Sequence, residues 1–174
     1  MMAGGRTGLA RDEQVLIVDR ENRPVGVSPR WEMRAGGLPH RATYILIFNR
    51  AGELHVQRRT TTKDVYPGHL DPATGGVVLA GESYEESAER ELAEEMGIRG
   101  VALAAGFDFW FDEAPVRVWG RVFVCRYDGP LVLQAEEVES VCFLTPEAVL
   151  ASAEKVTPDG LEVVRRYLAG RSAG

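Results

Sequence analysis

The sequence has few of the residues that mark secreted or membrane-spanning proteins. Only two of its 174 residues are cysteine. Cys125 and Cys142 both lie in apolar strand-like runs, which favours buried free thiols over a disulfide. No apolar run approaches the roughly 18 residues of a membrane span, and the N-terminal stretch has no signal-peptide core. We therefore expect a cytoplasmic protein that does not associate with membranes.

Basic residues are also in the minority. The chain has 20 Lys and Arg against 26 Asp and Glu, a formal net charge of −6. A general nucleic-acid binder needs a basic surface for phosphates, so we expect no nucleic-acid polymer as a partner. The length predicts one domain with a substantial core, with residues 1–12 as a flexible tail and 13–170 as the domain. Composition leaves monomer and homodimer open.

The apolar patterns predict a mixed α/β protein in which helices cover a sheet. Thr145 and Thr157 each precede a proline, which is typical of a helix start. In the last helix, Leu161, Val164 and Leu168 form the expected buried stripe. Strands are expected at residues 14–19, 42–48, 53–59, 101–111, 116–127 and 141–144, with a further short strand just after 128–130 and a hairpin joining the second and third.

The most informative stretch is residues 76–98, GVVLAGESYEESAERELAEEMGI. Ser83 and Glu86 form a capping-box pattern, which predicts a helix beginning after Ser83. Gly97 predicts the end of this helix, because glycine readily adopts the left-handed conformation found there. At 100° per residue, one apolar stripe contains Tyr84, Ala88, Leu92 and Met96.

A second stripe on the same helix is acidic. Glu91, Glu94 and Glu95 fall within an arc of about 100°. Crowded carboxylates repel one another and destabilise a helix, whereas a hard divalent cation such as Mg²⁺ or Mn²⁺ would turn this repulsion into attraction. The alternative is a solvated acidic face. We give that interpretation to Glu85, Glu86 and Glu89.

The pattern as a whole is far more specific than its glutamates. The stretch matches the Nudix box at every fixed position. The matching residues are a loop glycine, the distant Glu82, the triplet Arg90, Glu91 and Leu92, the paired Glu94 and Glu95, and Gly97. By ordinary residue frequencies, an accidental match in one register is on the order of one in a billion. The chain therefore resembles the Nudix hydrolases. The resemblance implies an α/β/α sandwich, with a mixed curved β-sheet flanked by helices and the box as loop–helix–loop.

The resemblance also implies a set of site residues. In the family, the glutamates matching Glu91, Glu94 and Glu95 hold the metal, and a loop glycine carbonyl matching Gly75 or Gly76 often joins them. Of the two glycines we assign Gly76 to the metal and Gly75 to the structural box. The implied reaction is Mg²⁺-dependent hydrolysis of a pyrophosphate linkage, in a nucleoside di- or triphosphate or another nucleoside diphosphate derivative, by a metal-activated water.

Two further roles accompany the metal ligands. Glu82 and Arg90 match a pair in which the arginine braces the box and orients a metal-binding carboxylate. The alternative is an ordinary surface ion pair, which contributes little. A general base is also needed, and both Glu91 and Glu137 are candidates. We favour Glu137, which lies in the acidic run 135–140 just before a predicted strand, although that run is equally compatible with a solvated loop.

The segment before the box, residues 38–68, resembles isopentenyl-diphosphate isomerases of the same superfamily. Residues matching Arg59 and Lys63 contact a diphosphate there, so we assign both to substrate binding; the alternative is solvent-facing charge. His40 matches a metal ligand, although a lone histidine is more often a cap or core residue. In these isomerases a catalytic cysteine aligns with Gly75, and a second metal-binding histidine aligns with Val77. Because this chain has neither side chain at those positions, we expect no isomerase activity.

The sequence says least about the substrate. A nucleoside requires an aromatic or apolar slot, and Trp31, Tyr66, Trp110 and Trp119 are candidates. Strand alternation places Trp110 on the more polar face, so we assign it to substrate binding; the alternative is an aromatic at a sheet edge. Two other functions stay open. A non-catalytic nucleotide-binding Nudix module usually lacks box carboxylates, and an acidic interaction module would leave the glycines unexplained.

Overall fold

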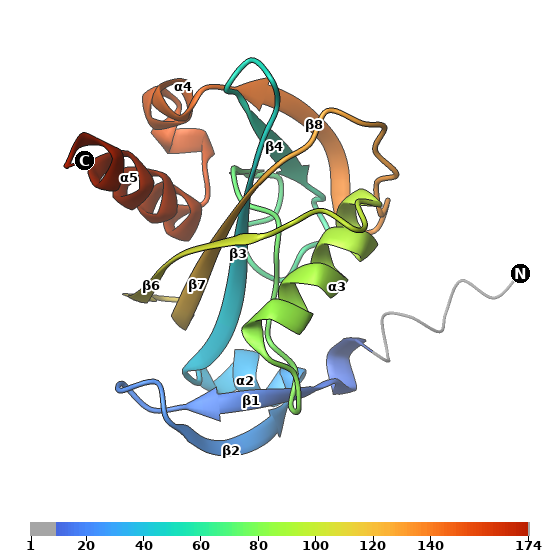
Figure 1. The fold of residues 1–174 in the computed structure, drawn as a ribbon. Helices are drawn as coiled ribbons and strands as arrows, with labels where there is room; N and C mark the ends of the chain where they lie inside the picture. Colours follow the sequence, from blue (N-terminus) through green and yellow to red (C-terminus); the bar gives the residue numbers. More distant parts are fainter. Residues whose placement is uncertain (1–9, 174) are drawn as a thin grey trace, which may run out of the picture.

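A computed structural model describes residues 10–173 of the chain (Figure 1). The predicted tail at 1–12 thus lies outside the described residues except for 10–12, which are helical. The helices are α2 Arg30–Gly36, α3 Tyr84–Met96, α4 Pro146–Ala151, the short 3₁₀ helix η1 Ala153–Lys155 and α5 Pro158–Ser172. No helix of the described chain is long and apolar enough to cross a membrane.

The strands form one mixed sheet centred on β3. They are β1 Gln14–Val18, β2 Pro24–Pro29, β3 His40–Phe48, β4 Leu54–Arg59, β5 Leu70–Asp71, β6 Ala104–Glu113, β7 Val116–Arg126 and β8 Val138–Leu144. Strand β3 pairs antiparallel with β1 and β4, and parallel with β7 along its whole length. Strands β5 and β8 both join β4, and β6 joins β7.

Both faces of this sheet are covered, which confirms the predicted α/β sandwich. Because side chains alternate along a strand, Ile45 and Ile47 of β3 pack with α3. Their neighbours Tyr44, Leu46 and Phe48 face the other side, where α4 and α5 lie. Figure 1 shows α3 and α5 on opposite sides of β3. All four residues of the predicted α3 stripe are buried.

Three local predictions were wrong or incomplete. The segment after residue 130 forms no strand; instead the backbone N–H groups of Val132 and Gln134 bond the carbonyls of Met96 (3.0 Å) and Glu95 (3.0 Å). Those carbonyls end α3 and lack partners within the helix. Strands β2 and β5 were not predicted, because β5 has only two residues and the short alternation of Val25 and Val27 in β2 lies between two prolines. Cys125 is buried as expected, but Cys142 is exposed, and both are free thiols.

Helix starts followed the sequence more closely. Thr145 Oγ1 accepts a hydrogen bond from the Ala148 N–H (3.1 Å), as a cap should. Thr157 precedes α5 with Pro158 at the first position, but its side chain forms no capping bond. In the α5 stripe, Leu161 and Val164 are buried, and Leu168 is partly buried against the same core.

Candidate active site

The helix of the box, α3, is held at both ends as predicted. Ser83 Oγ accepts a hydrogen bond from the Glu86 N–H (3.1 Å), and the Glu86 carboxylate accepts one from the Ser83 N–H (2.8 Å). Gly97 adopts the left-handed conformation, with φ 69°. A Cβ at this position would also meet the Cβ of Val132 at 2.7 Å. Fixed ends give the carboxylates between them a defined position.

Arg90 connects the box loop with the helix. Its Nε and Nη2 donate to the two Glu82 oxygens at 2.6 and 3.0 Å. Its Nη1 donates to Glu91 Oε1 at 2.8 Å and reaches Glu94 at 3.4 Å. The Glu82 carboxylate also accepts a hydrogen bond from the Leu79 N–H (3.0 Å). The bidentate ion pair of Arg90 with Glu82 is therefore part of a network that also holds the Glu91 carboxylate, which an isolated surface ion pair would not do.

Two of the three box carboxylates are buried. Glu91 and Glu95 are covered by the sheet and the box loop, whereas Glu94 is exposed. Gln57 of β4 donates a hydrogen bond to Glu95 Oε2 (3.0 Å). Burial and the neighbouring Glu91 raise the pKa of Glu95 to about 8, and burial raises the pKa of Glu91 against the opposing effect of Arg90. In the protein alone both carboxylates are therefore harder to ionise than free glutamates, and a bound cation would favour their charged form.

The box loop lies directly against this pair. A Cβ at Gly76 would come within 2.6 Å of Glu91 Oε1, so only glycine leaves the carboxylate in place. The Gly76 carbonyl accepts a hydrogen bond from the Thr43 N–H (2.9 Å). Within residues 10–173, no donor reaches the Gly75 carbonyl. These groups offer only oxygen atoms, the donors that Mg²⁺ prefers.

The donor set fits a magnesium ion that keeps part of its water shell. Among residues 10–173, no three carboxylate, imidazole or thiolate side chains are already grouped closely enough to bind an ion together. The preformed part is the buried pair Glu91 and Glu95. Mg²⁺ is commonly held by only one or two carboxylates with water completing its shell, so the pair suffices as the core of such a site.

Glu137, the favoured candidate for the general base, lies beside the box. Glu137 forms an ion pair with Lys63, and both residues line the same cavity as the three box glutamates; we call it the box cavity. Glu137 is held in a turn by a hydrogen bond from its N–H to the Gln134 carbonyl (2.9 Å). A candidate base and a candidate substrate contact, from segments 74 residues apart, are therefore brought to one place.

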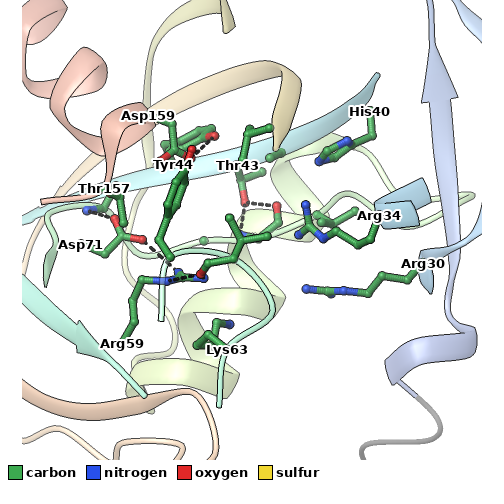
Figure 2. Close-up of a pocket in the computed structure, with 18 residues that line it drawn as sticks. Arg30, Arg34, His40, Thr43, Tyr44, Arg59, Lys63, Asp71, Thr157 and Asp159 are labelled. Carbon is green, nitrogen blue, oxygen red and sulfur yellow. Dashed lines mark hydrogen bonds and ion pairs between the residues drawn. The ribbon is translucent and has the colours of Figure 1, made fainter. Parts of the chain in front are cut away.

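A second cavity, here called the inner cavity, opens from the box cavity. Arg30, Lys63, Gly75 and Gly76 line both. Figure 2 shows the guanidinium groups of Arg30 and Arg34 pointing into the inner cavity. They are four residues apart, so α2 presents them on one side. Sequence reasoning missed both arginines, although their spacing in the run RWEMR was the available signal.

These features can be compared with known proteins. A family model described as NUDIX domain matches residues 38–167. The chain belongs to the Nudix family. It is 50% identical over 158 residues to the uncharacterized Nudix hydrolase PA4841 of Pseudomonas aeruginosa, covering 90% of this chain and 94% of that protein. It is 47% identical over 160 residues to Nudix hydrolase YfcD of Escherichia coli, covering 92% and 89%.

Solved structures agree with this assignment. DR0079 of Deinococcus radiodurans superimposes with a TM-score of 0.77 at 26% identity, covering 88% of this chain and 98% of that one. The MutT protein of Methanosarcina mazei gives a TM-score of 0.64 at 25% identity, covering 74% and 94%. This chain is a Nudix hydrolase, and its class as a whole cleaves pyrophosphate linkages.

The isomerase-like flank of this Nudix hydrolase departs from isomerase chemistry. A Cβ at Gly75 would meet the Thr43 carbonyl oxygen at 2.0 Å, so a cysteine does not fit there unless β3 moves. His40 is buried and its Nδ1 bonds the Leu38 carbonyl (3.0 Å). Burial, with Arg34 nearby, lowers the pKa of His40 to about 4. His40 lines the inner cavity and is not among the residues that line the box cavity.

Arg59 and Lys63 both reach the inner cavity, but in different ways. Arg59 donates from Nε (3.1 Å) and Nη2 (2.8 Å) to the Val65 carbonyl, and from Nη1 to Asp71 (3.2 Å). Its guanidinium therefore holds the loop that follows β4. Lys63 lies where the two cavities meet. The geometry is thus more favourable to a substrate contact for Lys63 than for Arg59.

The structure does not bring Trp110 to the site. Its ring lies against Trp119, with centroids 5.8 Å apart, and under the Arg20 guanidinium. Trp110 lines neither the inner cavity nor the box cavity. The predicted alternation of β6 is correct, with Asp108 and Asp112 exposed beside it. Trp110 lies away from both cavities because β6 is an edge strand and β7 separates it from β3; its stacking role stays a prediction without support from this geometry.

Proposed function

We propose that this Nudix hydrolase uses Mg²⁺ to cleave the pyrophosphate linkage of a nucleoside diphosphate derivative. One observation carries the proposal: a buried carboxylate pair, Glu91 and Glu95, opens onto a cavity whose nearest wall carries the cations Arg30, Arg34 and Lys63. Paired carboxylates beside a wall of basic side chains suit a metal ion on one side and phosphate groups on the other.

The metal ligands in this proposal are the box glutamates. Glu91 and Glu95 would hold the ion, Glu94 would complete the carboxylate set from the surface, and the Gly75 or Gly76 carbonyl would add a backbone oxygen. When bound, Mg²⁺ neutralises phosphate charge and lowers the pKa of a water molecule. Arg90 holds Glu91 in position through its contact with Glu82.

The remaining residues bind the substrate and accept the proton. Glu137 takes the role of general base, since Arg90 already binds one oxygen of Glu91 and the remaining oxygen would be needed to hold the ion. One oxygen of Glu137 pairs with Lys63, which leaves the second to accept a proton from the attacking water. Arg30, Arg34 and Lys63 hold the phosphate groups that point into the inner cavity, because guanidinium and ammonium groups form charge-assisted hydrogen bonds with phosphate.

The test is a Mg²⁺-dependent assay over a panel of nucleoside di- and triphosphates, nucleotide sugars and dinucleoside polyphosphates. Released phosphate is measured with and without added phosphatase, which distinguishes cleavage at the terminal phosphate from cleavage within a diphosphate bridge. The exposed Glu89→Gln on the same helix is the matched control for Glu95→Gln. Equal rates in these two variants at saturating Mg²⁺ would contradict the proposal, as would activity that survives removal of the metal.

A further inference from the structure

One glutamine is buried against the carboxylate pair of the box. Gln57 follows three buried residues of β4 and is itself only 3% exposed. A glutamine is usually exposed, and an amide in the protein interior costs free energy unless its polar atoms find hydrogen-bond partners. The partners of the Gln57 amide therefore show what a polar side chain does at this position.

The amide nitrogen of Gln57 donates to two oxygen atoms. Nε2 is 2.8 Å from Thr74 Oγ1 and 3.0 Å from Glu95 Oε2, and the Met96 sulfur lies 3.4 Å away. A primary amide has two N–H groups, so the two oxygen contacts account for both. Gln57 thus links β4 to the residue before Gly75 in the box loop and to the end of α3.

Thr74 is a fixed anchor for this amide. It is buried, its N–H donates to the Ile45 carbonyl (3.0 Å), and its own carbonyl accepts from the Ile45 N–H (2.6 Å). Because Ile45 belongs to the central strand β3, Thr74 cannot move without breaking backbone bonds to the sheet. The Gln57 amide is therefore held from one side by the sheet, and its second N–H is directed at Glu95.

This contact fixes how the Glu95 carboxylate is turned. Within residues 10–173, Gln57 is the one residue that donates a hydrogen bond to it, at Oε2, which leaves Oε1 for the box cavity that Glu95 lines. Glu91 is held by the cation Arg90, whereas Glu95 is held by a neutral group. A neutral donor orients the carboxylate without cancelling the charge that attracts a metal ion, and a lysine or arginine in its place would compete with that ion.

We propose that Gln57 is a positioning residue that directs Glu95 Oε1 toward a divalent cation, with Thr74 as the anchor of its amide. The presence of the cation rests on the proposed function. Neither Gln57 nor Thr74 lines the inner cavity or the box cavity, so both act through Glu95 and not on the substrate. Hydrogen-bond partners of metal ligands typically change metal affinity roughly 10- to 100-fold when they are removed.

The test uses Gln57→Met, which keeps the length of the side chain and removes both N–H groups. Mn²⁺ alone is added to the metal-free protein, and free Mn²⁺ is measured by electron paramagnetic resonance, so no turnover is needed. We expect the Kd for Mn²⁺ to rise about tenfold or more. The Mg²⁺ concentration for half-maximal hydrolysis should rise with it, while KM for the nucleotide at saturating Mg²⁺ is unchanged. Gln14→Met is the matched control, because Gln14 is exposed and donates to the Asp12 carbonyl (3.0 Å).

Thr74→Val removes the anchoring oxygen, preserves shape and leaves Gln57 in contact with Glu95. It should weaken Mn²⁺ binding less than Gln57→Met does, and it should add nothing in the Gln57→Met background, because Thr74 acts through the amide. Unchanged Mn²⁺ affinity in Gln57→Met overturns the proposal, whatever happens to the melting temperature, as does full additivity in the double variant or the absence of wild-type Mn²⁺ binding.

Two further outcomes are decided separately. If Gln57→Met does not fold, Thr74→Val decides alone, and wild-type Mn²⁺ affinity in that variant overturns the proposal. If the tenfold effect is present but no nucleotide is hydrolysed, the positioning role of Gln57 stands and the proposed function is refuted, since the resonance measurement needs no substrate.

Discussion

Gly76→Ala is the change that tests the geometry of the proposed metal site most directly. The new Cβ would lie 2.6 Å from Glu91 Oε1, whereas ordinary contact begins at 3.4 Å. The carboxylate must therefore withdraw by about 0.8 Å, and a misplacement of about 1 Å in a catalytic group costs roughly 100-fold in rate. It also loses the 2.8 Å contact with Arg90. We expect kcat/KM to fall about 100-fold while the fold is retained.

The assay measures kcat/KM at saturating Mg²⁺, with the melting temperature as a check of folding. Gly26→Ala is the matched control, because a Cβ at Gly26 meets nothing within 4 Å. A double-mutant cycle adds a second check: the shorter side chain of Glu91→Asp leaves room for the methyl group, so this change should cost less in the Gly76→Ala background than in the wild type. Wild-type activity in Gly76→Ala, or strict additivity in the cycle, would refute the reasoning.

Four further outcomes are expected. Glu94→Gln and Glu95→Gln should each lower kcat by orders of magnitude with the fold intact, because each removes an anionic ligand, whereas Glu89→Gln should not. A glutamate in the unfolded chain titrates near 4.5, but the pKa of Glu95 in the folded protein is raised to about 8. Between these values the folded state binds more protons than the unfolded state, so the melting temperature in EDTA should fall as pH rises through about 8. Glu95→Gln should flatten that curve. Lys63→Ala should mainly raise KM and make substrate binding less sensitive to salt; an unchanged KM would remove Lys63 from substrate binding. Incubation with isopentenyl diphosphate and Mg²⁺ should yield no dimethylallyl diphosphate, and its detection by chromatography would contradict the steric argument at Gly75.

The box helix was predictable because its determinants are local. The capping box lies within four residues, Gly97 ends the helix through its own backbone preference, and the apolar and acidic stripes follow from a fixed rotation per residue. The contact between Glu82 and Arg90 was predictable for another reason: the match to the Nudix box implied it. None of this required knowledge of the rest of the chain.

The sheet was harder to predict at its edges. An edge strand such as β2 has little burial to impose a pattern, and Val25 is 62% exposed. The residues after 130 have an apolar pattern that suits a strand, but their N–H groups find free carbonyls at the end of α3. Trp110 was placed on the correct face of β6, yet its distance from the box depended on strand order, which alternation does not reveal.

By itself, then, the sequence determined the helix of the box, its carboxylate face and the family. Tertiary structure alone decided what surrounds that face. Arg30 and Arg34 come from α2 and Gln57 comes from β4, and each looks like an ordinary polar residue in its own segment. Only the packing of these elements around β3 places cations beside the box and a buried amide donor against Glu95, because side-chain proximity across a sheet depends on long-range pairing that no local pattern encodes.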